Sequence, residues 1–491
     1  MKRASGILMH LSSLPSPYGI GTMGKAAYEF ADFLHAAGQH YWQLLPIGPT
    51  GYGDSPYQSA STWAGNPFFI DLDLLIAEGL LLQEEVDAVD WKAHEKRVDY
   101  GFQFYNRYPL LYQAFVRGRD RLAQEVQSFR DENPWVEDYA LFMAIKRSRN
   151  MESWDTWPEE IRLRRPGAVE TYSIVLAEDV NFFVFVQFLF FRQWIQLRDY
   201  VHSLNIELIG DLPIYVPYDS CDVWVNPELF QLDGNGTPIG VAGCPPDAFT
   251  ADGQLWGNPL YNWERMRQDG YAWWKKRIGA ASRLFDVTRI DHFRGIEAYW
   301  FVPYGDVTAR NGHWVKGPDM ELIQALRDAF PKLQLIAEDL GFQTPELARM
   351  LKASGYPGMR VLEFAFDSRE PNNYLPHRYE RNCICYSGTH DNETLRQWLD
   401  GLSEEVRTYL MEYLGISDPK DCLWGLLRAG MASVADVFIA QLQDYLELDG
   451  EGRMNFPGTF STDNWSWRMA ADACTPELAA RLRHMTRLYE R

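Results

Sequence analysis

The chain alternates between short apolar runs and longer stretches with helical periodicity. Each run ends in polar or turn-forming residues, and helical patterns such as 320–330 stand between several of them. The eight runs cover residues 6–11, 41–49, 206–216, 285–293, 333–341, 359–366, 383–391 and 436–444. Strands that alternate with helices are typical of parallel βαβ units, and eight such units predict a (β/α)8 barrel. A doubly wound open sheet is the alternative, but no glycine-rich phosphate loop follows the first run.

Two gaps between the runs are too long for single crossovers. The first contains helical patterns at 104–120 and 135–149, which predict a largely helical insertion over 68–178. The second is rich in Pro, Gly and Trp and predicts an insertion over 217–275, including a cleft-covering loop at 245–263. We expect both insertions to belong to a single catalytic domain over residues 1–491.

Three features predict a cytoplasmic protein. The most apolar segment, 181–191, is far shorter than a membrane span and contains Gln187, so a buried helix is expected. The apolar run near the N-terminus is too short for a signal peptide. The six cysteines are scattered and form no C-x-x-C pair, which indicates free thiols in a reducing compartment.

Charge and composition restrict the partners. A formal net charge of −20 repels nucleic acid and anionic membranes, so neither is expected as a partner, and the substrate should be neutral or cationic. Aromatic residues make up 14% of the chain. Most of these rings fill a core, but some can line a cleft, because an aromatic face offers a flat apolar platform.

Charged side chains gather where the predicted strands end. They are Asp211, Arg289, Asp291, Glu338, His390, Asp391 and Asp444. One carboxylate after a strand is usually a helix N-cap, but several on one rim of a barrel are the arrangement used for sugar chemistry or for metals. Mg²⁺ or Ca²⁺ would favour Asp or Asn clustered on one loop. The sequence has no such cluster, so we expect neither a metal nor another cofactor.

These strand ends carry a resemblance to a known family. "RIDHFRG", "AEDLG" and "GTHDNET" resemble the catalytic blocks of the α-amylase clan. The flanking segments "GILMHLSSLPSPYGIG", "GYGDSPYQS", "GDLPIYV", "PPDAFTADGQLWGNPLYNW" and "NFPGT" resemble the amylomaltases, the 4-α-glucanotransferases of glycoside hydrolase family 77. The similarity runs from about residue 5 to about residue 470. It implies a barrel of the α-amylase type.

The resemblance also implies roles for individual residues. Asp291 would be the nucleophile, Glu338 the general acid/base and Asp391 the third carboxylate, which holds donor-sugar hydroxyls. The expected sugar-binding residues are Tyr57, Asp211, Gln254, Trp256, Arg289, His390, Asn455 and Pro457. The implied reaction transfers part of an α-1,4-glucan to the 4-hydroxyl of another glucan or of glucose, through a covalent glycosyl-aspartate.

Elementary chemistry supports two of these roles independently. Arg289 lies two residues before Asp291, so both side chains can face one side of a strand, where the guanidinium favours the ionised carboxylate of a nucleophile. Taken alone, the pair would be read as an ordinary ion pair. Glu338 follows the apolar run "LQLIA", and partial desolvation there would raise its pKa toward the range of a working acid.

Alternatives stay open at this stage. The chain could be an α-glucan hydrolase of the same clan or, if its catalytic residues were lost, a non-catalytic glucan-binding protein. Trp256 could stack on the acceptor or merely pack its loop onto the barrel. Ala248 and Cys244 depart from the family's usual residues, which leaves acceptor preference undecided, and the sequence indicates no oligomeric state.

Overall fold

Eight parallel strands close into a barrel in the computed structural model, which describes the whole chain except residues 52, 92–95, 247–250, 342 and 367–371. The strand order around the barrel is β1-β12-β11-β10-β9-β6-β3-β2. Each strand overlaps one of the eight apolar runs, so the predicted (β/α)8 barrel is confirmed. The strands are β1 (Ala4–Leu8), β2 (Tyr41–Gln43), β3 (Glu207–Leu212), β6 (Val287–Ile290), β9 (Gln334–Ala337), β10 (Gly358–Val361), β11 (Cys383–Tyr386) and β12 (Val437–Gln441).

The strands are mostly shorter than the runs that predicted them. The run 285–293 contains only four strand residues, Val287–Ile290. The Asp291 amide still donates to the strand β3 carbonyl of Leu212 (2.9 Å), but His292 then leaves the ladder with a φ of +50°. The polar ends of the apolar runs therefore form the loops at the rim of the barrel.

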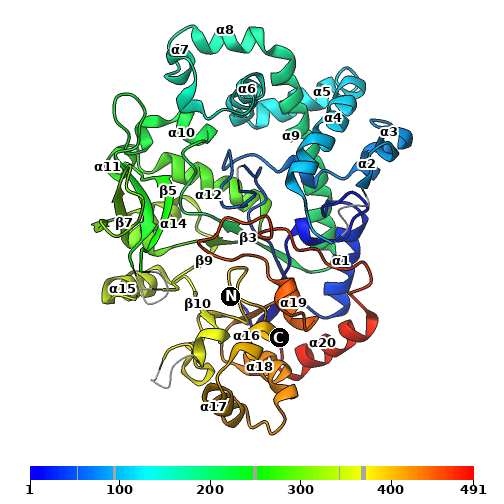
Figure 1. Cartoon of the computed structure of the whole chain (residues 1–491), viewed down its shortest axis with the longest axis vertical. Coiled ribbons are helices and arrows are strands. Elements are labelled where there is room, and N and C mark those ends of the chain that lie inside the picture. Colours follow the sequence, from blue (N-terminus) through cyan, green and yellow to red (C-terminus); the bar gives the residue numbers. More distant parts are fainter. Residues whose placement is uncertain (52, 92–95, 247–250, 342, 367–371) are drawn as a thin grey trace.

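Helices cover the outside of the barrel (Figure 1). They include α1 (Lys25–Ala36), α12 (Ala272–Leu284), α14 (Met320–Ala329), α15 (Pro345–Ser354), α18 (Cys422–Ala432) and α20 (Pro476–Leu488). Neighbouring helices in this ring pack together, as α1 does with α20 and α14 with α15. Helix α14 coincides with the helical pattern at 320–330 and buries Leu322, Ile323 and Leu326, which recur at the spacing of one helix face.

A largely helical layer lies between β2 and β3 in the sequence and at the top of Figure 1. It contains α2 (Leu72–Ala77), α3 (Gln83–Asp87), α4 (Tyr100–Gly118), α5 (Ala123–Glu132), α6 (Trp135–Ser148), α7 (Glu159–Arg162), α8 (Ala168–Val175) and α9 (Ala177–Ser203). Helix α9 packs against α4, α5 and α6. Among the described residues it is the one helix long and apolar enough to cross a membrane, but 72% of its most apolar window is buried inside the structure. The expectation of a buried helix at 181–191 is therefore confirmed.

A four-stranded antiparallel sheet beside the barrel was not predicted. Its order is β5-β4-β7-β8, with β4 (Gly240–Cys244), β5 (Gln254–Pro259), β7 (Ala298–Pro303) and β8 (His313–Lys316). The sheet joins two segments that are separated in the sequence by α12 and β6. It places Gln254 and Trp256 on a paired strand rather than on an irregular loop.

Two arginines close the other end of the barrel, where the strands begin. The buried guanidinium of Arg491 donates to the carbonyl oxygens of Met431 (2.7 Å), Ala4 (2.8 Å) and Ala435 (3.2 Å). Arg3 donates to the Met431 carbonyl as well (3.0 Å). These carbonyls belong to the chain that enters β1 and β12, so the two side chains satisfy backbone groups that would otherwise be buried without partners.

Candidate active site

The strand register brings the predicted carboxylates to one rim of the barrel. Asp211 on β3 is in register with Arg289 on β6. Asp291 and Glu338 directly follow β6 and β9, two adjacent strands whose last residues are in register. The Glu338 amide continues this ladder by donating to the carbonyl of Ile290 (3.1 Å). The two carboxylates therefore leave neighbouring strands at the same level, as a pair that acts on one glycosidic bond must.

A buried arginine links two of these carboxylates. Nη1 of Arg289 donates to both carboxylate oxygens of Asp211 (2.8 and 2.7 Å), and its Nη2 lies 3.0 Å from Oδ1 of Asp291. Burial alone would lower the pKa of Arg289, but the charges of Asp211 and Asp291 raise it well above its ordinary value. A guanidinium fixed in this way places a positive charge directly beside Asp291, the candidate nucleophile.

The environment of Glu338 favours the protonated form of its carboxyl group. Burial, and then the negative charge of Asp291, raise the pKa of Glu338 to about 8. Two backbone amides orient its carboxyl group: His292 N donates to Oε2 (2.8 Å) and Leu340 N donates to Oε1 (2.6 Å). Glu338 therefore carries a proton at neutral pH and is held in one orientation, which suits a general acid.

The backbone at His292 makes the first of these contacts. Its φ of +50° is uncommon for a residue other than glycine, and it accompanies the turn that aims the amide at Glu338. Burial lowers the pKa of the His292 ring to about 4, so the ring stays neutral beside Asp291. The segment "RIDHFRG" predicts no role for His292, because the residue type does not reveal a left-handed conformation.

Asp391 lies on the loop that follows β11. Its Oδ1 accepts a hydrogen bond from Asn455 Nδ2 (2.7 Å) and lies 3.4 Å from Nε2 of His390. Its side chain is 47% exposed, more than that of Asp291 (30%), so both carboxylates are open to solvent and to a ligand. Pro457 is exposed two residues beyond Asn455.

Tyr57 connects the two sides of the rim. Its hydroxyl donates to Asp211 Oδ2 (2.7 Å) and lies 3.4 Å from Nδ1 of His390, on which its ring stacks with centroids 5.0 Å apart. The ring of Trp465 lies 5.8 Å from both rings and was missed by the sequence analysis. The signal available was its position in an aromatic stretch shortly after "NFPGT".

The segment expected to cover the cleft, residues 245–263, contains strand β5. Gln254 and Trp256 lie on β5, where Trp256 Nε1 donates to Gln254 Oε1 (3.1 Å) and the indole meets the His292 ring edge-on at 4.7 Å. The half-buried Trp256 thus contacts the residue that follows Asp291 in the sequence. Tyr261 and Trp263, in contrast, are buried and anchor the segment in the core.

Two residues in or next to this segment, Cys244 and Ala248, depart from the family's usual residues. Cys244 ends β4 and is in register with Gln254, so it lies beside a candidate ligand-binding residue. Ala248 and Phe249 lie outside the described residues. A left-handed turn at Gly257, with φ of +77°, follows Trp256 directly.

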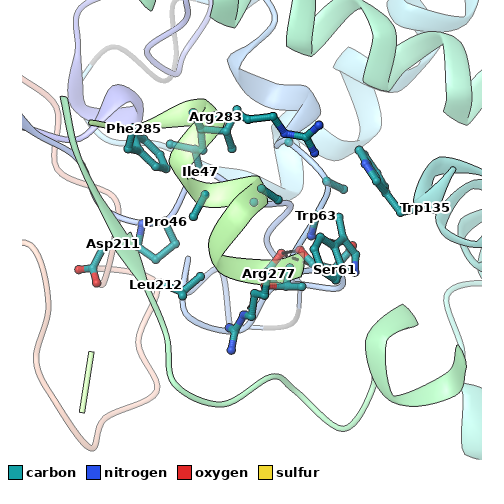
Figure 2. A pocket seen from close by; sticks show the side chains of 18 of the residues that line it. Pro46, Ile47, Ser61, Trp63, Trp135, Asp211, Leu212, Arg277, Arg283 and Phe285 are labelled. Carbon is teal, nitrogen blue, oxygen red and sulfur yellow. Dashed lines mark hydrogen bonds between the residues drawn. The ribbon is translucent and has the colours of Figure 1, made fainter. Parts of the chain in front are cut away.

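A cavity of about 420 Å³ lies behind the rim, between the barrel wall and the helical layer (Figure 2). Tyr57 and Asp211 line it together with α12 and the loop after β2, whereas Asp291, Glu338 and Asp391 do not. Figure 2 shows Asp211 on one side of this cavity and Trp135 of α6 on the other. Arg277 ties the wall together by donating to Ile214 O (2.9 Å) and Thr62 Oγ1 (2.7 Å). The three candidate catalytic carboxylates therefore lie outside the lining of this cavity.

Comparisons with known proteins show the family to which the chain belongs. The model of glycoside hydrolase family 77, described as 4-alpha-glucanotransferase, matches residues 9–473. A 4-alpha-glucanotransferase of Clostridium butyricum is 46% identical over 486 residues, which cover 98% of this chain and 100% of the relative. One of Streptococcus pneumoniae is 44% identical over 496 residues, which cover 100% of this chain and 98% of the relative.

A solved structure extends the similarity to three dimensions. The amylomaltase of Streptococcus agalactiae in complex with acarbose is 39% identical, with a TM-score of 0.97, and each chain covers 100% of the other. The resemblance seen in the sequence blocks is thereby confirmed over the full length. The chain therefore belongs to glycoside hydrolase family 77, the 4-alpha-glucanotransferases.

Proposed function

We propose that this enzyme breaks an α-1,4-glucan and transfers the donor part, with retention, to the 4-hydroxyl of a second glucan or of glucose. The observation that carries the proposal is the pair of carboxyls on adjacent strands, Asp291 beside a fixed guanidinium and Glu338 with a pKa near 8. Retaining glycosidases separate the two roles in this way, with carboxyls about 5–5.5 Å apart. The acarbose complex of the Streptococcus agalactiae amylomaltase supports a saccharide ligand for this chain as well.

In the first step, a carboxylate oxygen of Asp291 attacks the anomeric carbon while the glycosidic C–O bond breaks. Glu338 gives its proton to the leaving oxygen, so a neutral acceptor-side glucan departs. The product is an ester between the donor sugar and Asp291. Asp391, Asp211, Arg289, His390 and Tyr57 are proposed to hold the hydroxyls of that sugar, since they surround the same rim.

Esterification prepares the second step. Once Asp291 is an ester, it no longer carries the negative charge that raises the pKa of Glu338. The ionised Glu338 then takes the proton of an acceptor 4-hydroxyl, the acceptor oxygen attacks the anomeric carbon, and the Asp291 carboxylate is released. Atoms and charges balance over the cycle without a cofactor, and we propose that none is needed.

Transfer rather than hydrolysis requires that the acceptor is held and water is kept away. We propose that Trp256 and Gln254 on β5 form the acceptor side, because Trp256 contacts the residue next to Asp291. The segments 68–178 and 217–275 are proposed as insertions that build the walls of this cleft. Among the described residues, Cys221, Cys383, Cys385, Cys422 and Cys474 are free thiols, which supports a reducing location such as the cytoplasm.

Incubation with pure maltotriose tests the proposal. A transferase produces a ladder of shorter and longer oligosaccharides while the number of reducing ends stays constant. A hydrolase of the same clan would release glucose and maltose with a steady rise in reducing ends, and a non-catalytic binder would leave maltotriose unchanged. Either of these results would refute the proposal.

A further inference from the structure

The loop that carries His390 and Asp391 is held at both ends by one buried carboxyl group. This loop runs over residues 387–394, from β11 to α16 (Leu395–Gly401). Asp444 Oδ2 accepts a hydrogen bond from Ser387 Oγ (2.5 Å), and its Oδ1 accepts one from Leu395 N (2.8 Å). A single side chain thus spans the first residue of the loop and the first residue of the helix beyond it.

Asp444 takes no part in the proposed chemistry. It lies in α19 (Leu442–Tyr445), directly after β12, and its exposed fraction is 0%. Burying a carboxyl group is costly unless hydrogen bonds compensate it, and burial raises the pKa of Asp444 to about 7 against the effect of its two bonds. Since Asp444 takes no part in the chemistry, its unfavourable burial indicates a role in holding the structure around it.

The interior of the loop transmits this restraint. Asn392 Oδ1 accepts hydrogen bonds from the Thr389 amide (2.9 Å) and hydroxyl (2.8 Å), and that hydroxyl also accepts from Asp391 N (3.4 Å). There is little room to shift, because a Cβ on Gly388 would lie 2.6 Å from Oε1 of Glu363. The backbone of Asp391 is therefore fixed once the ends of the loop are fixed.

The side chain of Asp391 depends on that backbone. It is 47% exposed, and a single hydrogen bond to its carboxylate, from Asn455, is found among the described residues. His390 has independent support, since it stacks on Tyr57. The backbone of Asp391 also has a contact outside the loop, because its carbonyl accepts a hydrogen bond from Arg453 Nη2 (3.0 Å).

We propose that Asp444 is a positioning residue for Asp391: it sets the place of the third carboxylate by holding both ends of the loop. The inference rests on the proposed function, in which Asp391 holds the donor sugar. Replacing Asp444 by Ala leaves Ser387 Oγ and Leu395 N buried without their acceptor. Misplacing a catalytic group by about 1 Å can lower turnover by about 100-fold.

A double-mutant cycle tests the proposal. Fluoride release from α-maltosyl fluoride is measured for the wild type, Asp444→Ala, Asp391→Ala and the double variant, so that slow variants stay measurable. We expect Asp444→Ala to lower kcat by roughly 10- to 100-fold in the wild-type background and to have almost no effect in the Asp391→Ala background. Asp444→Asn should restore most of the activity, because its amide can accept from Leu395 N and donate to Ser387 Oγ.

Asp436 supplies the matched control. It is buried just before β12, at the opposite end of the same strand, and accepts a hydrogen bond from Arg381 Nε (3.1 Å). Asp436→Ala should lower the thermal midpoint and leave kcat unchanged. If Asp444→Ala keeps the wild-type kcat, or loses the same factor in both backgrounds, the positioning role is refuted. Should Asp444→Ala not fold, Ser387→Ala decides, and an unchanged kcat for that variant would refute it.

The same data separate this inference from the proposed function. A wild-type enzyme that releases no fluoride, or an Asp391→Ala variant as active as the wild type, would contradict the proposed function. An active wild type, an impaired Asp391→Ala variant and an unimpaired Asp444→Ala variant would contradict the positioning role alone.

Discussion

Two buried arginines at opposite ends of the barrel have pKa values that are shifted in opposite directions. Arg289 at the rim is 4% exposed, and Arg491 at the floor is 6% exposed. The carboxylates of Asp211 and Asp291 raise the pKa of Arg289 well above its ordinary value, overcoming the effect of burial. Burial, and then the positive charge of Arg3, lower the pKa of Arg491 to about 10, and its guanidinium donates to the backbone carbonyls of Met431 and Ala4.

The difference shows how one architecture separates chemistry from stability. At the floor, carbonyl oxygens satisfy a guanidinium without adding charge, so that end gains hydrogen bonds but no reactive group. At the rim, buried charges are paired, which contributes little net stability but fixes the orientation and ionisation of the groups that act on substrate. Barrels of this kind carry catalytic residues at the carboxyl ends of their strands.

The largest effect is expected from removing the acting carboxylate at the rim. Asp291→Ala should lower transfer from maltotriose by at least about 10⁴-fold, since no other group can form the ester, while glucan binding stays measurable by calorimetry. Asp436→Ala at the floor serves as the control and should keep its turnover. If Asp291→Ala retained a substantial fraction of turnover, Asp291 would not be the nucleophile.

A smaller loss is expected at Glu338. Glu338→Gln should slow turnover of natural glucans by roughly 10²–10⁴-fold and spare the release of fluoride from α-maltosyl fluoride, which needs no proton. Because the pKa of Glu338 is raised to about 8, kcat/KM of the wild type should fall as the pH rises above about 8 and the acid is lost. The variant should lack this alkaline decline. Equal damage with both substrates would argue for a structural role.

A change of a few-fold is expected within the rim at Trp256. Trp256→Ala should raise the ratio of hydrolysis to transfer, measured as reducing ends against ladder products, because the acceptor is held less firmly. Packing alone predicts a lowered thermal midpoint with an unaltered ratio. That second result would remove Trp256 from the acceptor side.

No effect on turnover is expected at the floor. Arg491→Met removes a donor from several carbonyls. Arg3 still donates to that of Met431, but each group left unsatisfied costs roughly 1–3 kcal/mol of the free energy of unfolding. The thermal midpoint should fall while kcat at 25 °C is unchanged. A lowered kcat at full folding would show that the two ends are coupled and that the comparison fails.

The sequence reveals the rim better than it reveals the rest. Apolar runs locate all eight strands because each strand is buried and local in sequence, and the polar ends of those runs mark Asp291 and Glu338. The antiparallel sheet was missed, since β4 and β7 pair across some fifty residues of intervening chain. The turn at His292 and the set of backbone carbonyls that accept from Arg491 depend on backbone geometry, which residue types do not reveal.

The most direct test of the rim is to trap its covalent intermediate. The Glu338→Gln variant is reacted with α-maltosyl fluoride, digested and examined by mass spectrometry. Fluoride leaves without a proton, and the missing base slows the second step, so the ester should accumulate. We predict one maltosyl group on the peptide that contains Asp291, attached to the side chain of that residue. Attachment to Asp211, Asp391 or another carboxylate, or fluoride release with no adduct, would contradict it.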